Sequence, residues 1–271
     1  MSNDKEVATK KKNEVATIDI EKFADQGFEN IDSKSLQLPF LKILGQLSPQ
    51  VTAGDSKYIE AAKPGMIYNT VTDKLYDGNK GMLVIPAYYK FEYIEWADRG
   101  QEGSSAPRNI YPADSDVMSK TNRGDDGKDR LENGNYVEDT GNHFVYVLDS
   151  DYNPVETALI SMKSTQKKKS KTWNSMMQSR RMKGKKGFFT PPSWATAYRL
   201  KTTKESNSQN SWYGWVIEFD RYLDDPKLSG TLESTKAFYE SAKQSDIFGK
   251  VDFGKEGSAD AKQVTDQSTP F

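Results

Sequence analysis

One long apolar run sets the strongest limit on how this chain can fold. Residues Gly81 to Trp96 are rich in Val, Ile, Tyr and Phe, and Gly78 to Gly81 read as a turn before them. β-Branched and aromatic residues of this kind favour a strand. Polar and apolar residues alternate imperfectly along the run, so we expect the strand to be buried on both faces in places. The run therefore predicts a fold organised around a sheet.

The rest of the chain predicts further strands and a few helices. Strand-like runs cover Gly65–Val71, His143–Asp149, Val155–Met162, Phe188–Leu200 and Trp212–Phe219. Helical patterns cover Asp19–Gln26, the centre of Lys163–Lys183, and Leu232–Ala242. The apolar stretch Leu36–Leu47 has Pro39 near its start, where the first turn of a helix tolerates proline. We predict a mainly β chain of the α+β class, compatible with an OB-fold-like antiparallel barrel with helical additions.

Composition along the chain predicts one central domain between flexible ends. Residues 1–17 are rich in Lys, Asn and Glu and are expected to form a disordered arm. Residues 18–248 are expected to form a single domain. Residues 98–142 hold many Gly, Ser, Asn and Asp and are expected to form a long loop or insertion within it. Residues 249–271 are expected to be a flexible tail.

Charge is divided into blocks that the formal net charge of −1 conceals. Between Glu156 and Glu205 there are thirteen Lys or Arg residues and no acidic residue. From Glu92 to Glu156 there are instead fifteen acidic residues and six basic ones. Blocks of opposite sign indicate a polarised surface. The basic block also contains aromatic residues, and this combination is typical of grooves that bind single-stranded nucleic acid.

The candidate binding residues all lie in the basic block. Lysines and arginines would neutralise phosphates, and aromatic rings would stack on bases. The cations are Lys167, Lys168, Lys169, Lys171, Arg180, Arg181, Lys183, Lys185 and Lys186. Trp173 is the first choice for stacking, followed by Phe188 and Trp194. The competing interpretations are a solvated lysine face and tryptophans that pack into the core.

Composition also limits the other kinds of site. The chain has no cysteine and one histidine, His143, which excludes disulfides, thiolate nucleophiles and multi-histidine metal sites. The acidic pairs Asp114/Asp116, Asp125/Asp126, Asp149/Asp151 and Asp224/Asp225 lie among turn-forming residues, where aspartate bonds to local backbone. We therefore expect no metal site, no cofactor and no enzymatic activity. No apolar run is long enough to cross a membrane, and no secretion signal is present, so we expect a soluble intracellular protein.

Several of these segments resemble bacteriophage single-stranded DNA-binding proteins. The resemblance rests on Ser164–Ser175, Thr190-Pro-Pro, Tyr198–Thr203 and Ser211-Trp-Tyr-Gly-Trp215. The last two residues, Pro270 and Phe271, are similar to the C-terminal tip of bacterial single-strand binding proteins, which recruits replication and repair partners. The resemblance implies an OB-fold core and a regulatory tail. The tail departs from the pattern, because residues 252–271 hold four acidic residues and two lysines, not a dense acidic run.

These observations predict a non-enzymatic protein that coats and protects single-stranded DNA during phage DNA replication or recombination, without sequence preference. Pro270 and Phe271 would bind replication or recombination proteins, and the site of action would be the cytoplasm of an infected bacterium. A metal-dependent nuclease, an RNA-binding protein and a structural interaction module are the alternatives. The sequence leaves oligomeric state, site size and cooperativity open.

Overall fold

The computed structural model describes residues 26, 37–98, 100–101, 106–208 and 210–244. The chain divides into two compact units, Met1–Leu36 and Gln37–Phe271. Every described residue except Gln26 lies in the second unit. The predicted disordered arm (1–17), the predicted helix at Asp19–Gln26 up to its last residue, and the predicted tail (249–271) lie outside the described residues.

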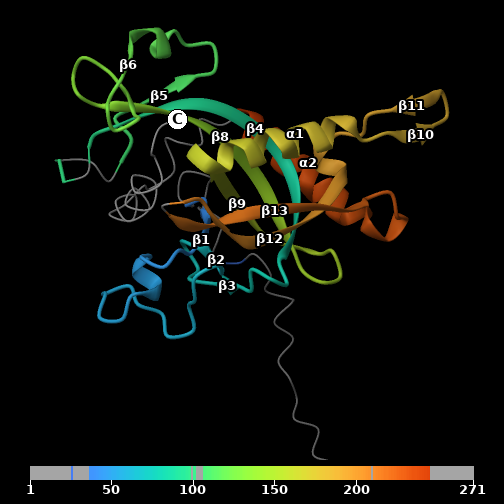
Figure 1. The fold of residues 1–271 in the computed structure, drawn as a ribbon. Helices are drawn as coiled ribbons and strands as arrows, with labels where there is room; N and C mark the ends of the chain where they lie inside the picture. Colours follow the sequence, from blue (N-terminus) through green and yellow to red (C-terminus); the bar gives the residue numbers. More distant parts are fainter. Residues whose placement is uncertain (1–25, 27–36, 99, 102–105, 209, 245–271) are drawn as a thin grey trace, which may run out of the picture. The chain divides into compact units, whose positions relative to one another are not determined.

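An antiparallel sheet of eight strands forms the centre of the second unit, and it curls into a half barrel (Figure 1). Its main path runs in the order β13 (Ser211–Tyr222), β12 (Thr196–Ser206), β4 (Met82–Trp96), β8 (Tyr136–Leu148), β7 (Asp129–Arg130) and β6 (Asn122–Arg123). Two further strands leave this path: β5 (Asn109–Pro112) pairs with β4, and β9 (Pro154–Met162) pairs with β8. The mainly β prediction is therefore confirmed.

Strands β4 and β8 pair along almost their whole length, and different strands join them at the two ends of this pairing. Near Leu83, β4 also pairs with β12, whereas near Tyr93 it pairs with β5. Met82–Ala87 are all buried, as the apolar run predicts for a strand covered on both faces. The long strand predicted at Gly81–Trp96 is confirmed.

Residues 98–142 are more structured than a loop. They contain β5, the 3-10 helix Val117–Lys120, β6, β7 and the start of β8. Glu95, which is buried, accepts hydrogen bonds from Asn109, Tyr111, Asn133 and Asn135 at 2.5–3.1 Å. Burial alone would raise the pKa of Glu95, but these four donors lower it to about 2. Polar side chains, and not an alternating apolar pattern, order this segment.

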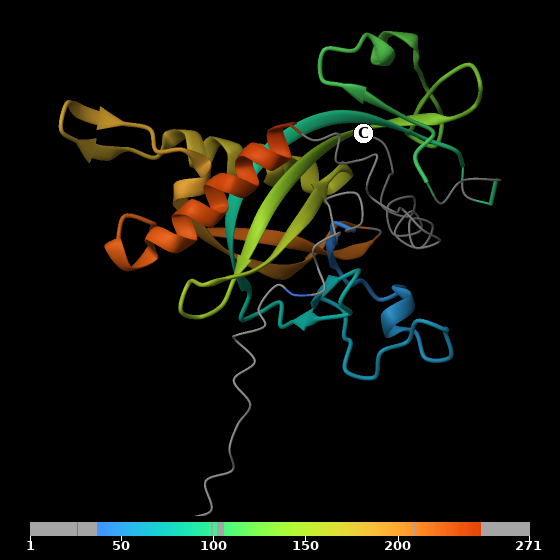
Figure 2. The same cartoon turned by 180° about the vertical axis from the view of Figure 1, so that it is seen from behind.

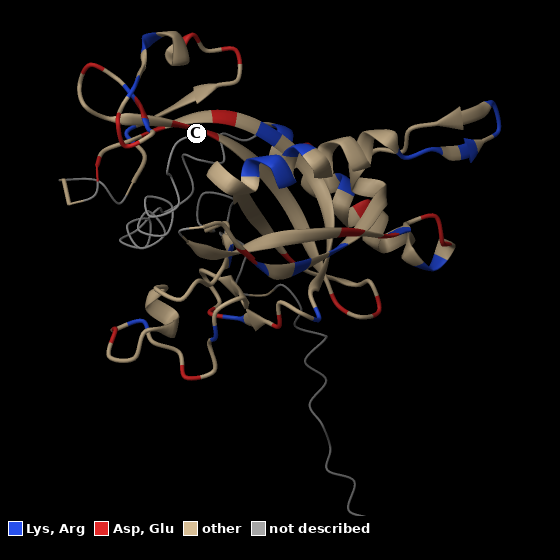
Figure 3. Ribbon diagram, viewed as in Figure 1, with Lys and Arg blue, Asp and Glu red and all other residues tan. Residues whose placement is uncertain are grey.

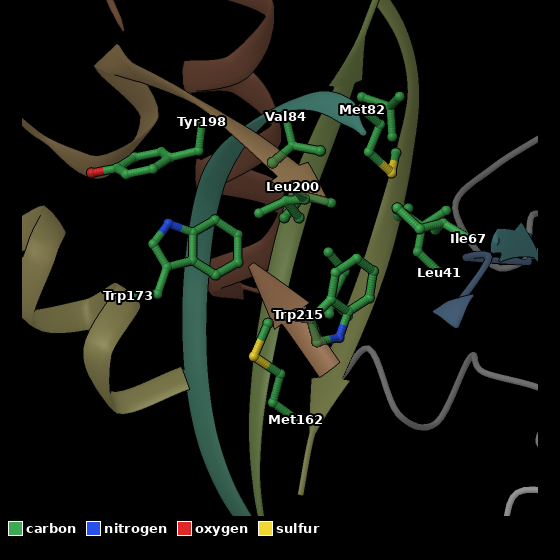
Figure 4. Packing of buried hydrophobic residues seen from close by; sticks show 13 residues of the cluster. Leu41, Ile67, Met82, Val84, Met162, Trp173, Tyr198, Leu200 and Trp215 are labelled. Atoms are coloured by element: carbon green, nitrogen blue, oxygen red, sulfur yellow. The ribbon is translucent and has the colours of Figure 1, made fainter. Parts of the chain in front are cut away.

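The largest apolar core lies against the strands β4, β8, β9, β12 and β13 (Figure 4). Trp173, Tyr198, Leu200 and Trp215 lie in it, and none has more than 3% of its surface exposed. Trp173 enters this core from α1 (Lys167–Ser179), the helix between β9 and β12. The predicted helix within Lys163–Lys183 is confirmed.

A smaller sheet made of β1 (Leu41–Ile43), β2 (Ile67–Asn69) and β3 (Leu75–Tyr76) packs next to β9. The backbone N–H of Leu159 donates to the Pro39 carbonyl at 2.8 Å, and Phe40 forms a parallel bridge with Leu159. The suggestion of a helix near Pro39 is therefore wrong. Extended backbone here provides a carbonyl for a free N–H group at the edge of β9, and a helix would use its own carbonyls for internal hydrogen bonds. The strand predicted at Gly65–Val71 is confirmed as β2.

The helix α2 (Ser229–Gln244) packs against β4, β8 and β9 and confirms the helix predicted at Leu232–Ala242 (Figure 2). Two further apolar clusters include residues of this helix or of the turn before it: Ala242 in one and Leu228 in the other. Thr235, which is buried, donates to the backbone carbonyl of Trp194 at 3.2 Å. The helix thereby fixes the segment that leads into β12.

Candidate nucleic-acid interface

The helix α1 has one buried side and one cationic side. Ser170 and Trp173 are buried, and Met177 packs partly against the core one turn further on, as the helical repeat requires. On the other side Lys168 and Lys171 are exposed. The lysine run of the sequence thus wraps around the helix, and only part of it faces solvent.

Trp173 is a core residue, which corrects its place as the first choice for stacking on bases. It has no exposed surface. Its ring stacks on His143 with centroids 4.5 Å apart and meets Tyr198 edge-on at 5.7 Å. The reason is the helical spacing of Trp173 with Ser170 and Met177, which turns all three side chains toward the sheet. A base could not reach this ring without opening the core.

Three lysines near the start of α1 are neutralised by acidic residues from other strands. Lys163 lies 2.7 Å from Glu138, Lys167 pairs with Asp139, and Lys169 lies 2.6 Å from Glu205. The acidic partners belong to β8 and β12, far away in the sequence. Lys167 and Lys169 are therefore engaged inside the protein. Their predicted role at phosphates is weaker than that of Lys168 and Lys171, which form no ion pair in the described part of the chain.

Arg180 and Arg181 fix the end of α1. The guanidinium carbon of Arg180 lies 3.8 Å from the centre of the Phe219 ring, a cation–π contact with β13. Nη1 of Arg181 donates to the carbonyl of Gln178 at 2.8 Å and to the hydroxyl of Thr190 at 2.7 Å. Both arginines were expected at phosphates. The structure shows both in contacts that hold the segment after the helix; Arg181 is also exposed, and its role at phosphates stays a prediction.

That segment forms a two-stranded hairpin, β10 (Met182–Gly184) and β11 (Gly187–Phe189), which projects away from the main sheet (Figures 1 and 2). Lys185 and Lys186 form its turn. Gly187 closes the turn with a φ of 116°, a value that side chains rarely allow. The turn predicted at Gly184–Gly187 is confirmed, but Phe188 and Phe189 belong to this hairpin and not to the following long strand, which starts at Thr196.

The hairpin combines cations with exposed rings. Lys183, Lys185 and Lys186 are exposed, and Phe188 has 75% of its surface exposed. Phe189, which was not among the predicted site residues, is 46% exposed. Figure 3 shows the lysines of the hairpin and of α1 with no acidic residue on either element. The hairpin therefore brings two exposed phenylalanines and three exposed lysines together on one projecting element.

Trp194, the third candidate for stacking, packs inward. It is only half-buried, but it contributes to the apolar cluster around Ile85 and Leu223. Its ring centroid lies 6.4 Å from that of Tyr239 on α2. Phe188 is therefore the one predicted aromatic that the structure places on an exposed surface. Pro270 and Phe271 lie outside the described residues.

The acidic pairs that the sequence raised as metal ligands can be checked in the part of the chain that the structure describes. No group of three or more His, Asp or Glu side chains there could hold a metal ion. Asp149 accepts from the backbone N–H groups of Asp151 and Asn153, and Asp225 accepts from that of Lys227. Turn formation is thus the role of these two aspartates, as their sequence context predicts. Among the described helices, none has the length and apolar character of a membrane span.

Fold and surface together define a mainly β protein that carries a cationic, aromatic hairpin after its first helix. Residues 8–247 match the model of one protein family, the Pam3 phage gp34-like proteins. Because this match covers most of the 271 residues, the chain belongs to that family. The family name points to a bacteriophage origin. A search of curated proteins and a search of solved structures each gave no match.

Proposed function

We propose that this protein binds single-stranded DNA without enzymatic activity and with little sequence preference, and coats it during phage DNA replication or recombination. The observation that carries the proposal is the β10–β11 hairpin, where Phe188 is exposed beside Lys183, Lys185 and Lys186. Stacking on an aromatic ring is open to any base, and lysine contacts to phosphate are independent of sequence.

The order of the strands supports an OB-type barrel as the scaffold. Strands β4, β8, β9, β12 and β13 follow one another in the chain and lie in the sheet order β13-β12-β4-β8-β9. Numbered one to five, they give the order 5-4-1-2-3, with α1 between the third and fourth strands. An OB-type barrel has this order and this helix, and it is a common platform for single strands.

The remaining parts of the proposal rest on the sequence and the family. A phage family supports action in the cytoplasm of an infected bacterium. Pro270 and Phe271 would bind replication or recombination proteins of that cell. RNA is the other single strand that the same contacts would accept, since stacking and charge do not read the sugar.

A salt titration of the full-length protein tests the proposal. Fluorescence anisotropy is measured with labelled oligo-dT, the matching RNA and a blunt duplex between about 50 and 200 mM salt. We expect both single strands to bind more tightly than the blunt duplex, and a logarithmic salt slope that falls by about 0.7 for each phosphate contact removed. Undetectable binding to every strand at low salt would refute the proposal.

Matched variants assign the binding to the hairpin. The double substitution Lys185→Ala/Lys186→Ala should weaken binding and lower the salt slope. The control Lys63→Ala/Lys80→Ala removes two exposed lysines from another part of the surface and should leave both quantities unchanged. Equal effects from the two double variants would mean that general charge, and not the hairpin, attracts the strand. Incubation of labelled DNA with Mg²⁺ should leave it intact, and cleavage would favour a nuclease.

A further inference from the structure

The two phenylalanines of the hairpin lie on opposite faces of its ribbon. In the antiparallel register Lys183 pairs with Phe188, and Met182 pairs with Phe189. Directly paired residues point to the same face, and successive residues point to opposite faces. One face of the ribbon therefore carries Phe188 with Lys183, and the other carries Phe189 with Met182. Both rings are exposed, at 75% and 46%.

A ribbon with a ring on each face is too thick to enter an intact duplex. Sheet layers with side chains pack about 10 Å apart, whereas successive base pairs are separated by about 3.4 Å along the helix. A flat stacking platform, by contrast, needs only one aromatic face. Rings on both faces suit a place where two strands have already separated and pass on either side.

The base of the hairpin is held firmly enough to keep the ribbon in one direction. Arg181 links the end of α1 to Thr190, directly after β11, at 2.7 Å. The hydroxyl of Tyr222 on β13 donates to the Arg181 carbonyl at 3.3 Å, and Arg180 lies over Phe219 of the same strand. The end at Arg180 and Arg181 is thus joined to β13, and the end at Thr190 is joined to Arg181, so both ends of the ribbon are tied to the sheet directly or through Arg181.

The tip of the ribbon has the charge that a fork of DNA requires. Lys185 and Lys186 lie exposed at the turn, and Lys183 lies on the same face as Phe188. Residues 157–204, which include the whole hairpin, contain no acidic residue. Two phosphate backbones converge where a duplex opens, and this place has a higher density of negative charge than one single strand.

We propose that the β10–β11 hairpin binds the junction between duplex and single-stranded DNA, with one strand passing along each face. Phe188 stacks on the last base pair of the duplex, and Phe189 contacts the first unpaired base of the displaced strand. The hairpin binds base pairs at the end of the duplex after they have opened thermally, so binding needs no nucleotide hydrolysis. This inference rests on the proposed function and adds a preferred form of DNA.

The test compares three labelled DNAs with the full-length protein: a fork with two single-stranded arms, one arm alone, and a blunt duplex. We expect the fork to bind roughly 5- to 10-fold more tightly than the single arm, the gain that one additional stacked base supplies. A 2-aminopurine at the first unpaired position of the displaced strand should brighten when protein is added, because Phe188 takes its place on the last base pair and the probe loses that stacked neighbour. Equal affinity for fork and single arm overturns the inference and leaves the proposed function standing. Loss of binding to every DNA would refute both the inference and the proposed function.

Variants of Phe188 distinguish a hairpin that binds the junction from a general DNA-binding surface. Phe188→Ala should abolish the preference for the fork and the 2-aminopurine signal while the salt slope stays the same. Phe188→Trp should retain the preference, and its new indole should be quenched by the fork. Val155→Ala is the control, since Val155 is 48% exposed on β9 and outside the hairpin. If Phe188→Ala binds the fork as wild type does, the assignment of the hairpin is wrong.

Discussion

His143 and Trp173 stack in the core with their ring centroids 4.5 Å apart and their planes inclined by 22°. The contact joins the only histidine of the chain, on β8, to the tryptophan of α1. Nε2 of His143 lies 2.8 Å from the hydroxyl of Ser170 on the same helix. One buried side chain therefore both packs on the helix and forms a hydrogen bond with it.

Acid should weaken the fold through His143. Burial lowers the pKa of His143 from 6.5 to about 3, so between these values the unfolded chain binds a proton that the folded chain does not. Stability contributed by the neutral ring is complete above pH 6.5 and is lost as pH falls, at up to about 1.4 kcal/mol per pH unit. Urea denaturation at pH 7.0, 6.0 and 5.0 measures this slope. His143→Gln should be less stable at pH 7 and have a smaller slope; an unchanged slope would contradict the assignment.

Glu95 should stabilise the segment from β5 to β8. Replacement by glutamine puts an amide donor where the carboxylate accepts from four side chains, so Glu95→Gln should cost roughly 1.5–3 kcal/mol. Hydrogen–deuterium exchange of residues 106–135 should rise together with the loss in urea stability. Glu132→Gln, an exposed residue of the same segment, is the control and should change neither. Because the pKa of Glu95 is lowered to about 2, its contribution is lost only as pH falls from about 4.5 toward 2.

The sequence predicted the elements that have a regular pattern. The run Gly81–Trp96 predicted β4 because it is rich in Val, Ile, Tyr and Phe. Trp173 and Met177 revealed the helix by their spacing, and the same spacing indicates a buried side, which the surrounding lysines concealed. Phe188 is exposed, as a stacking ring must be, but the sequence placed it at the start of a strand Phe188–Leu200, whereas it lies in the hairpin after the turn at Gly184–Gly187.

Other features depend on contacts between distant residues. The pairs of Lys167 with Asp139 and Lys169 with Glu205 join different strands to α1, so the basic block alone could not show which lysines are neutralised. Residues 98–142 resembled a loop because β6 and β7 have two residues each, too few for alternation. Glu95 on β4 accepts hydrogen bonds from four side chains of this segment, and only the fold brings these partners together.

Arg181 should position the hairpin and not hold a phosphate. Arg181→Ala removes the hydrogen bond to Thr190, so affinity for single-stranded DNA should fall several-fold while the salt slope is kept. Thr190→Val removes the same bond from the other side and leaves every charge in place. The two changes should be non-additive in a double-mutant cycle on binding, with a coupling of about 0.5–1 kcal/mol, close to the effect of either single change. A salt slope lowered in Arg181→Ala alone would show direct phosphate contact instead.

Gly78 should tolerate no side chain. A Cβ there would lie 2.0 Å from the Gly65 carbonyl oxygen and 2.1 Å from the Thr202 hydroxyl, so Gly78→Ala should cost at least about 1–3 kcal/mol. Gly230→Ala is the matched control, because a Cβ at this position in α2 meets nothing within 4 Å. It should be neutral or stabilise the fold by up to about 1 kcal/mol. Thermal denaturation of both variants decides this, and similar melting temperatures would contradict the predicted contact.

The long pairing of β4 with β8 also bears on how such a protein can change over evolutionary time. The end near Leu83 and Leu148 also pairs with β12 and β9, and the end near Tyr93 and Tyr136 also pairs with β5 and β7. Both parts of the sheet therefore share the pairing of β4 with β8. Residues could be inserted or deleted beyond Trp96 and before Tyr136 without touching a side chain around Trp173. Members of the family can therefore be expected to differ most in length between these two residues, and to conserve the spacing of the strands that enclose the core.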